Sequence, residues 1–262
     1  MEAHPNVGRV AVDDVAIRFK SNLGEVTALD RTQLALEPGT FTALIGPSGC
    51  GKSTLMNAIA GFVEPSDGKL TLDGAPILGP SNDVGVIFQQ YALFPWFTAL
   101  GNVRFGLKQM GLSKREEVDR ARAALDEVGL SEHADKFPQQ LSGGMKQRVA
   151  IARTFVVGPK VFLMDEPFGA LDAQTRISMH SLLMRVWRKH RATVLFVTHD
   201  VDEALLLADD VHVMSHAPGR MIRHYNLTQE RPRAFSRSGP ELLDIREEIL
   251  GLLRPDEDLT AT

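Results

Sequence analysis

One stretch of this chain constrains its fold more than any other. Residues 46–53 read Gly-Pro-Ser-Gly-Cys-Gly-Lys-Ser and match the phosphate-binding pattern G-x-x-x-x-G-K-[ST] at every fixed position. The apolar residues 41–45 before it predict a buried strand, and residues 53–60 after it predict a helix that ends at Gly61. Strand, glycine-rich loop and helix are the context that the pattern requires. This context favours a phosphate site over a glycine-rich turn with a solvated lysine.

The residue types in this stretch suit a nucleotide. Glycines allow consecutive backbone N–H groups to turn toward phosphate oxygens, and the N-terminus of the following helix adds its partial positive charge. Lys52 supplies a point charge for the β- and γ-phosphates, and the Ser53 hydroxyl is placed to reach Mg²⁺. We expect ATP or a similar triphosphate to bind with Mg²⁺ through Gly46, Pro47, Ser48, Gly49, Cys50, Gly51, Lys52, Ser53 and Thr54.

Cys50 is the one cysteine of the chain, so no internal disulfide can form. Its thiol lies beside Lys52 and a helix N-terminus, an environment in which a cysteine tends toward the reactive thiolate. The alternative is that Cys50 is a small residue that fits the loop. The sequence leaves both hypotheses open.

The composition is that of an ordinary globular protein. The chain has 262 residues, 44% of them hydrophobic and 24% charged, and its formal net charge is −4. Basic and acidic residues are interspersed, so we expect no nucleic acid partner. Residues 1–8 lack a basic start followed by an apolar core, which predicts no secretory signal. Residues 84–103 carry no charge, but glycine, proline and glutamine residues interrupt them and argue against a membrane span.

Short strands are predicted on both sides of the phosphate loop. Residues 10–12 and 15–19 predict a strand pair, residues 34–36 lead into a Pro38-Gly39 turn, and residues 69–74 predict a strand stopped by a glycine. Phe19 is the upstream aromatic best placed to stack on a purine ring. It could equally be an ordinary core or edge-strand phenylalanine.

The middle of the chain, residues 88–158, is mainly helical in pattern. Residues 113–116 form a capping box, and Val118, Ala121, Leu125 and Val128 recur on one face of the helix that follows. Ser142, Gly143 and Gly144 begin another helix whose bare amide groups could bind an anion. Ser142 could also be a simple N-cap.

Acidic residues follow a second buried strand. Residues 161–164 are apolar, and Asp165 and Glu166 come directly after them, at the strand end where ligands bind in doubly wound sheets. We expect Asp165 to orient Mg²⁺ and Glu166 to act as the general base on water. A helix over residues 173–191 and a buried strand over 193–197 lead to His199, expected at the same sheet edge and in contact with the γ-phosphate.

Together these residues resemble the ATPase subunit of an ATP-binding-cassette (ABC) transporter over residues 10–223. The resemblance implies an α/β fold: a P-loop NTPase core with a mostly parallel sheet, an antiparallel β subdomain and a helical signature subdomain. Its motifs are Walker A at residues 46–53, the Q-loop at 88–89, the signature at 141–145, Walker B at 161–165, the D-loop at 170–172 and the switch histidine at 199. The implied segments are 1–88 (core with Walker A), 89–158 (helical subdomain), 159–225 (core with Walker B) and 226–262 (tail and helix).

The resemblance also implies roles for single residues. Catalysis would use Lys52, Glu166 and His199; Mg²⁺ would be bound by Ser53, Gln89 and Asp165; adenine would stack on Phe19, where tyrosine is commoner; and Asp172 would act in the D-loop. A second copy of the chain would complete the site in a head-to-tail dimer through Ser142, Gly143, Gly144 and Met145. Met145 replaces the usual glutamine, which removes a side-chain hydrogen bond but keeps the serine and the amide donors.

A narrower resemblance, to bacterial importers of nitrate, sulfonate or taurine, rests on residues 46–53, 94–96, 217–220 and 231–233. It implies a membrane permease as partner, a periplasmic or lipid-anchored solute-binding protein as indirect partner, and a place on the cytoplasmic face of the inner membrane. The alternative is a soluble ABC-type ATPase that acts on macromolecules, in iron–sulfur assembly or DNA repair. Repair types carry long heptad inserts, and this chain has no sustained heptads.

Four aromatic residues lie within residues 91–97, directly after Gln89. Such a cluster is either a satellite core under a loop or the docking surface for a partner. Because aromatic side chains dominate many interfaces, Tyr91, Phe94 and Trp96 are the expected contacts with the permease.

Overall fold

The computed structural model describes residues 8–21, 24–231, 233 and 240–254. Two regions discussed above lie outside the described residues: Pro232 of the motif at 231–233, and residues 1–7 of the segment 1–8 for which we predict no secretory signal. The chain divides into two compact units, Ser81–Ala192 and Asn6–Pro80 with Thr193–Thr262. We call the first the helical unit and the second the sheet unit, and describe each by itself.

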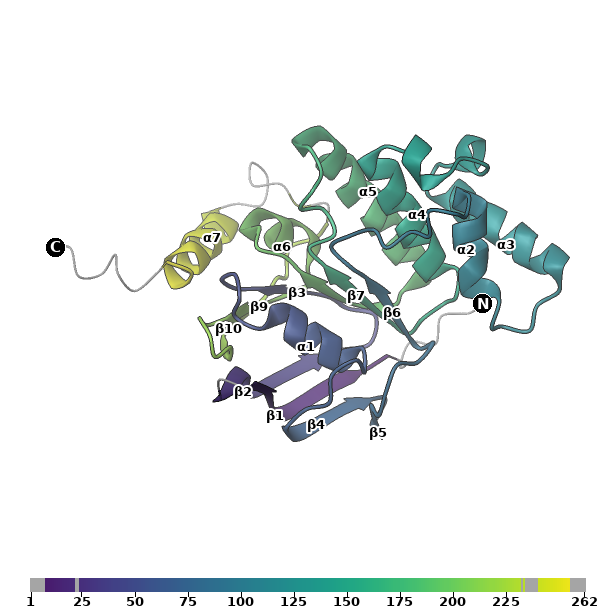
Figure 1. Ribbon diagram of the computed structural model, residues 1–262. Helices are drawn as coiled ribbons and strands as arrows, with labels where there is room; N and C mark the ends of the chain where they lie inside the picture. The colour runs from purple at the N-terminus through teal and green to yellow at the C-terminus, as the bar shows by residue number, and fades with distance from the viewer. Residues whose placement is uncertain (1–7, 22–23, 232, 234–239, 255–262) are drawn as a thin grey trace. The chain divides into compact units, whose positions relative to one another are not determined.

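An antiparallel sheet in the order β2-β1-β4-β5 forms one layer of the sheet unit (Figure 1). Its strands are β1 (Val10–Ser21), β2 (Gly24–Leu36), β4 (Asp67–Leu72) and β5 (Ala75–Pro76). The strand pair predicted over residues 10–19 is wrong, because both halves belong to β1. Asp14 adopts a φ of 51° where the pairing register shifts, so the polar interruption is a bulge and not a turn.

The second layer of the sheet unit has a parallel centre. Strand β3 (Phe41–Ile45) lies between β8 (Thr193–Val197) and β9 (Asp210–Met214), parallel to both, and β10 (Met221–Asn226) pairs antiparallel with β9. Every residue of β3 and β8 is buried, which confirms the prediction from their apolar runs.

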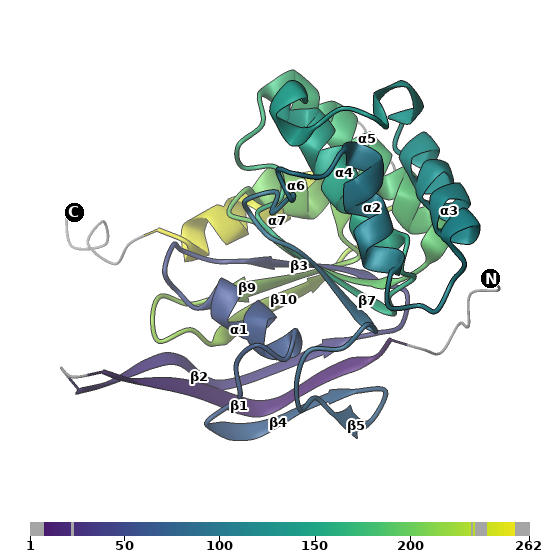
Figure 2. The same ribbon diagram turned by 45° about the vertical axis from the view of Figure 1, so that its right-hand side comes forward.

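Helices cover both faces of this parallel layer. Helix α1 (Lys52–Ile59) lies between it and the antiparallel sheet, and α6 (Val201–Leu207) packs on the other face of β3 (Figure 2). The predicted C-terminal helix is confirmed as α7 (Pro240–Leu252), which packs on α6 through the buried Leu242 and Ile249.

The helical unit contains a parallel strand pair and a group of helices. Strand β6 (Val84–Ile87) pairs with β7 (Val161–Asp165). The helices are α2 (Ala99–Leu107), α3 (Lys114–Glu127), the 3₁₀ turns η1 (Ser131–His133) and η2 (Pro138–Gln140), α4 (Gly143–Phe155) and α5 (Ala173–His190). Both hydrogen bonds of the predicted capping box form, between Ser113 and Glu116.

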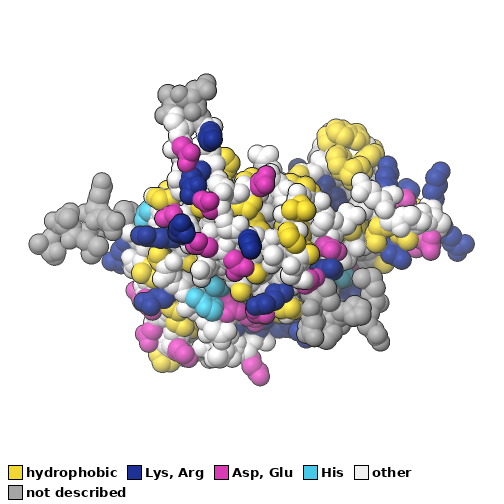
Figure 3. All heavy atoms as spheres, turned by 90° about the horizontal axis from the view of Figure 1, so that it is seen from below, with side chains coloured by type: hydrophobic (Ala, Val, Ile, Leu, Met, Phe, Trp, Pro, Cys, Tyr) yellow, Lys and Arg dark blue, Asp and Glu magenta, His cyan; other side chains and the backbone are white. Residues whose placement is uncertain are grey.

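Residues 84–103 form β6, a loop and the start of α2, as their glycine and proline residues indicate. Within the described part of the chain, no helix has both the length and the apolar character that a membrane crossing requires. The face of the molecule shown in Figure 3 carries acidic and basic side chains side by side.

The C-terminal end of α6 is held by a buried arginine. Arg233 is 7% exposed, and its guanidinium donates to the carbonyl oxygens of Gln229 (2.9 Å), Leu227 (3.0 Å), Leu205 (3.3 Å) and Ala208. Carbonyls at a helix end have no partner within the helix, so a side-chain donor there stabilises the end. This contact explains one basic residue of the motif at 231–233.

We expect Arg233→Met to lower the free energy of unfolding by at least about 2 kcal/mol, because each buried carbonyl left without a donor costs about 1–3 kcal/mol. Urea unfolding followed by circular dichroism measures the change. Arg220→Met, at an exposed arginine of the same unit, is the control and should leave the midpoint unchanged. Equal midpoints for the two variants would show that Arg233 does not hold α6.

Candidate nucleotide-binding site

The phosphate loop connects β3 to α1 in the sheet unit. Gly51 is the N-cap residue of α1 and has a φ of 104°, so no side chain caps the amides of the first turn. A Cβ atom at Gly51 would lie 2.7 Å from the Ala28 carbonyl oxygen of β2, so only glycine fits there. The loop therefore presents bare helix N-terminal amides, as an anion site requires.

Lys52 points back into this loop. It is 6% exposed, and its ammonium donates to the carbonyl oxygens of Gly46 and Pro47, both at 2.8 Å. A buried ammonium needs such partners. Phosphate oxygens carry more negative charge than carbonyl oxygens and would bind the same ammonium more strongly. The Lys52 ammonium thus lies in the loop, as the sequence pattern predicts.

Cys50 is buried, with 1% of its surface exposed, and its sulfur lies 3.9 Å from the Lys52 ammonium nitrogen. Burial blocks a reagent from reaching the thiol. Of the two hypotheses for Cys50, the structure favours the small residue that fits the loop over the reactive thiolate.

The loop rests on a turn that sequence reasoning did not assign to it. A Cβ atom at Gly219, between β9 and β10, would overlap the Cys50 carbonyl oxygen. Gly219 also donates to the Ala28 carbonyl oxygen at 3.0 Å and accepts from the Asp30 amide at 2.9 Å. Gly219 belongs to the motif at 217–220 named above, but the motif could not show that this residue packs against the phosphate loop.

His199 follows β8, which lies beside β3. The two strands are parallel, with Leu44 opposite Val197, and the Thr198 amide donates to the Leu44 carbonyl oxygen at 3.2 Å. Parallel neighbours end at the same edge, so His199 and the phosphate loop leave the sheet together. The His199 side chain is exposed. This confirms its predicted place at the edge that carries Lys52.

The helical unit repeats this arrangement with other residues. Strands β6 and β7 are parallel, with Ile87 opposite Met164, and the Q-loop and Glu166 follow their carboxyl ends. The Gln89 amide nitrogen donates to Glu166 Oε2 at 3.3 Å. Glu166 has a φ of 42°, an unusual conformation for a residue with a side chain. Asp165 is the last residue of β7 and Glu166 follows it, so both carboxylates lie at the carboxyl end of this strand, as predicted.

The signature glycines pack against Tyr91, which lies just after the Q-loop, and Thr175, which lies just after the D-loop. A Cβ atom at Gly143 would lie 3.0 Å from Tyr91 Oη, and one at Gly144 would lie 2.7 Å from Thr175 Cγ2. Ser142 is the N-cap of α4, and its hydroxyl accepts from the Met145 amide at 3.3 Å. The simple N-cap hypothesis for Ser142 is thus met, and the anion hypothesis remains a prediction.

Asp172 of the D-loop caps α5 by accepting from the Thr175 amide at 3.0 Å. Hydrogen bonds from Thr175 hold the pKa of the Asp172 carboxyl below its ordinary value. The contact with Thr175 links Asp172 to Gly144, so the D-loop and the signature share one packing site.

The predicted stacking and docking aromatics are placed as follows. Phe19 is 45% exposed on β1, so its ring is accessible to a ligand. Phe94 lies at the centre of an aromatic cluster, with ring centroids 4.5 Å from Phe105 and 5.6 Å from Trp96. Trp96 is 67% exposed. The segment therefore has a packed centre and an exposed tryptophan.

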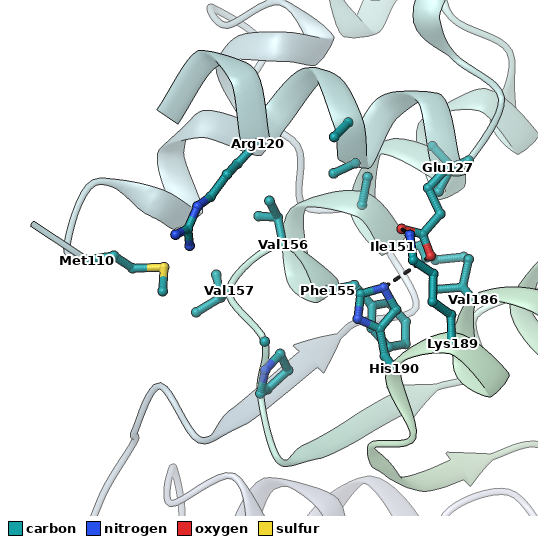
Figure 4. A pocket seen from close by; sticks show the side chains of 16 residues that line it. Met110, Arg120, Glu127, Ile151, Phe155, Val156, Val157, Val186, Lys189 and His190 are labelled. Carbon is teal, nitrogen blue, oxygen red and sulfur yellow. Dashed lines mark hydrogen bonds and ion pairs between the residues drawn. The ribbon is translucent and has the colours of Figure 1, made fainter. Parts of the chain in front are cut away.

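A further pocket of about 450 Å³ lies in the helical unit between α3, α4 and α5 (Figure 4). Its walls are mainly apolar, including Phe155 and Val186. Glu127 accepts from Lys189 at 2.8 Å and contacts the His190 ring nitrogen at 3.1 Å. No residue of the nucleotide motifs lines the pocket, and no sequence pattern predicted it.

Comparison with known families finds a match over the part of the chain that contains most of these motifs. Residues 29–169 match the ABC transporter family model. The chain belongs to the ABC transporter family. It is an ATPase subunit, which binds ATP and couples its hydrolysis to transport.

Relatives within this family include two importer subunits. The chain is 45% identical to the taurine import ATP-binding protein TauB of Rhizobium johnstonii over an alignment of 257 residues. The alignment covers 95% of this chain and 97% of the relative. It is 44% identical to the nitrate import ATP-binding protein NrtD of Synechocystis sp. over 253 residues, or 94% and 95% of the two chains.

A solved structure of the family is also similar. It is a dimeric ATP-binding cassette in a post-hydrolysis state with ADP and Pi bound, with a TM-score of 0.74 and 31% identity. The likeness covers 86% of this chain and 100% of the other. The fold expected from the motifs, α/β with a P-loop core, an antiparallel sheet and a helical part, is confirmed.

We expect a thiol reagent such as DTNB to react with Cys50 in the native protein at least about tenfold more slowly than in urea, because reaction requires local opening. Absorbance of the released thiolate measures both rates. The chain has one cysteine, so no other thiol contributes. Prompt reaction of one thiol in the native protein would contradict the burial of Cys50.

Proposed function

We propose that this chain is the ATP-hydrolysing subunit of an importer for a small polar solute of the nitrate, sulfonate or taurine kind. The names of TauB and NrtD, each aligned over nearly the whole chain, support the importer class. The observation that carries the hydrolytic role is the hydrogen bond between Gln89 and Glu166 at the carboxyl ends of β6 and β7.

In this proposal the residues have separate tasks. Lys52 binds the β- and γ-phosphates, because its ammonium already lies inside the loop. Glu166 accepts the proton of the attacking water, and Gln89 holds its carboxylate in place. His199 donates to the γ-phosphate, and Phe19 stacks on the adenine.

Ser53, Gln89 and Asp165 are proposed to bind Mg²⁺. A hydroxyl, an amide oxygen and a carboxylate are hard oxygen ligands of the kind that Mg²⁺ prefers. Within the described residues no group of three or more His, Cys, Asp or Glu side chains could hold a metal, so we infer that the ion binds together with the nucleotide phosphates. When bound, Mg²⁺ neutralises charge on those phosphates.

A second copy of the chain is proposed to complete each site. Ser142 is exposed at the start of α4, where the amides of Gly143 and Gly144 can bind an anion. The dimeric cassette among the similar structures supports a head-to-tail dimer in which residues 142–145 contact the γ-phosphate of the partner. Residues 89–158 would be the subdomain that presents this signature.

We expect Glu166→Gln to keep ATP binding, to lose at least about 99% of turnover and to form a stable dimer with ATP and Mg²⁺, because the general base is removed. A phosphate-release assay and sedimentation velocity measure these effects. Glu132→Gln, which changes the charge equally at an exposed turn, is the control with normal turnover. A monomeric Glu166→Gln variant at saturating ATP would overturn the dimer.

The aromatic cluster is proposed as the contact with the permease. Its most exposed member is Trp96, and Tyr91 joins it to the signature through the approach to Gly143. Arg153 of α4 donates to the Ala92 carbonyl oxygen at 2.7 Å and lies 5.8 Å from the Phe94 ring centroid. Movement of this segment would therefore displace α4. Through the permease, the subunit would lie on the cytoplasmic face of the membrane, and a solute-binding protein would act outside it.

We expect Trp96→Asp to leave ATP binding unchanged but to weaken co-purification with the permease at least about tenfold, because an exposed aromatic at an interface is often worth 2 kcal/mol or more. Pull-down from detergent-solubilised membranes measures the ratio of the two proteins. Leu78→Asp, at a leucine 94% exposed, is the control. Normal co-purification of Trp96→Asp would show that the docking surface lies elsewhere. The pocket of Figure 4 would then be the next candidate.

A further inference from the structure

Glu203 is a buried acidic residue to which none of the family motifs assigns a role. It is 5% exposed in α6, the helix that follows His199. Acidic side chains are rarely buried to this extent unless they are hydrogen-bonded, because desolvating a carboxylate is costly. Its contacts therefore need an explanation.

The carboxylate of Glu203 meets the hydroxyl of Thr198, the residue directly before His199. Thr198 Oγ1 donates to Glu203 Oε2 at 2.8 Å, and Thr198 is 2% exposed. An O–H···O hydrogen bond of this length is well formed, and leaving either of these buried groups without its partner would be costly.

The same hydroxyl holds the residue on the other side of His199. Thr198 Oγ1 accepts from the Asp200 amide at 3.0 Å. Asp200 Oδ1 in turn accepts from the amides of Asp202 (2.9 Å) and Glu203 (3.1 Å) and caps α6. The backbone directly after His199 is thus bound to the buried hydroxyl of the residue directly before it.

Thr198 is also fixed to the strand that carries the phosphate loop. Its amide donates to the Leu44 carbonyl oxygen of β3 at 3.2 Å. His199 itself is exposed. The buried pair beside it constrains the backbone on which His199 lies.

We propose that Thr198 and Glu203 are positioning residues that fix the backbone of His199 relative to the phosphate loop. This inference rests on the proposed role of His199 in ATP hydrolysis. Without the Thr198 hydroxyl, the His199 backbone would sample several orientations, and the imidazole would reach the γ-phosphate in only a fraction of them. A misplacement of about 1 Å can cost up to about a hundredfold in rate.

The test compares substitutions that keep or remove the hydroxyl. We expect Thr198→Val to lower kcat for ATP hydrolysis between about tenfold and a hundredfold, with KM for ATP changed by less than about threefold, because Lys52 and the loop amides still hold the phosphates in the proposed site. Thr198→Ser keeps the hydroxyl and should hold kcat within about threefold of wild type. Glu203→Ala should resemble Thr198→Val, and Glu203→Gln, which keeps an acceptor oxygen, should be less affected.

Thr193→Val is the matched control. Thr193 is a buried threonine at the other end of the same strand, and its hydroxyl accepts from the Gly39 amide at 2.9 Å. It should lower the thermal unfolding temperature as much as Thr198→Val but leave kcat unchanged. Equal kcat losses in Thr193→Val and Thr198→Val would show a general structural effect and overturn the proposal.

His199→Ala separates failure of this inference from failure of the proposed function. If wild type hydrolyses ATP, His199→Ala does not, and Thr198→Val matches wild type, the positioning role is wrong and the role of His199 stands. If His199→Ala matches wild type, the proposed role of His199 is wrong, and the inference falls with it. A fluorescent ATP analogue measures binding for each variant.

Discussion

Parallel pairing of adjacent strands is the constraint on which the candidate site depends. Because parallel neighbours end at one edge, β3 and β8 bring the phosphate loop and His199 out of the sheet unit together. The pairing of β6 with β7 does the same for Gln89 and Glu166 in the helical unit. Strands β3 and β8 are fully buried and β7 is buried except at its last residue, so a shift of register would expose apolar residues and is strongly disfavoured.

Glycine residues also allow the loops of the site to pack closely against neighbouring segments. Gly51 packs on β2 and Gly219 on the Cys50 carbonyl, which leaves the phosphate loop little freedom before a ligand binds. Gly144 brings α4 against Thr175 beside the D-loop cap, so two motifs distant in sequence move as one. A methyl group would force backbone apart at Gly51 and Gly219 and would collide with the Thr175 side chain at Gly144. Glycine therefore occurs where these loops must be held close to their neighbours.

Buried polar contacts fix both ends of α6. The Thr198 hydroxyl and Glu203 hold its first turn, and the Arg233 guanidinium donates to the Leu205 and Ala208 carbonyl oxygens at its end. Arg246 of α7 adds an ion pair with Asp202 at 2.6 Å. The helix after His199 is therefore fixed at both ends by groups that would be costly to leave unpaired. Its short length makes these contacts more important than its own helix propensity.

The local pattern of the sequence determined much of this protein. Full apolar runs predicted β3, β7 and β8, the capping box predicted α3, and the loop motif predicted the cation at Lys52. These are short-range properties that neighbouring residues settle. Only the tertiary structure decided that residues 10–19 form one bulged strand, that Cys50 is buried, and that Thr198 meets Glu203. Each depends on which distant backbone or side chain occupies the adjacent space, and residue spacing along the chain does not encode that directly.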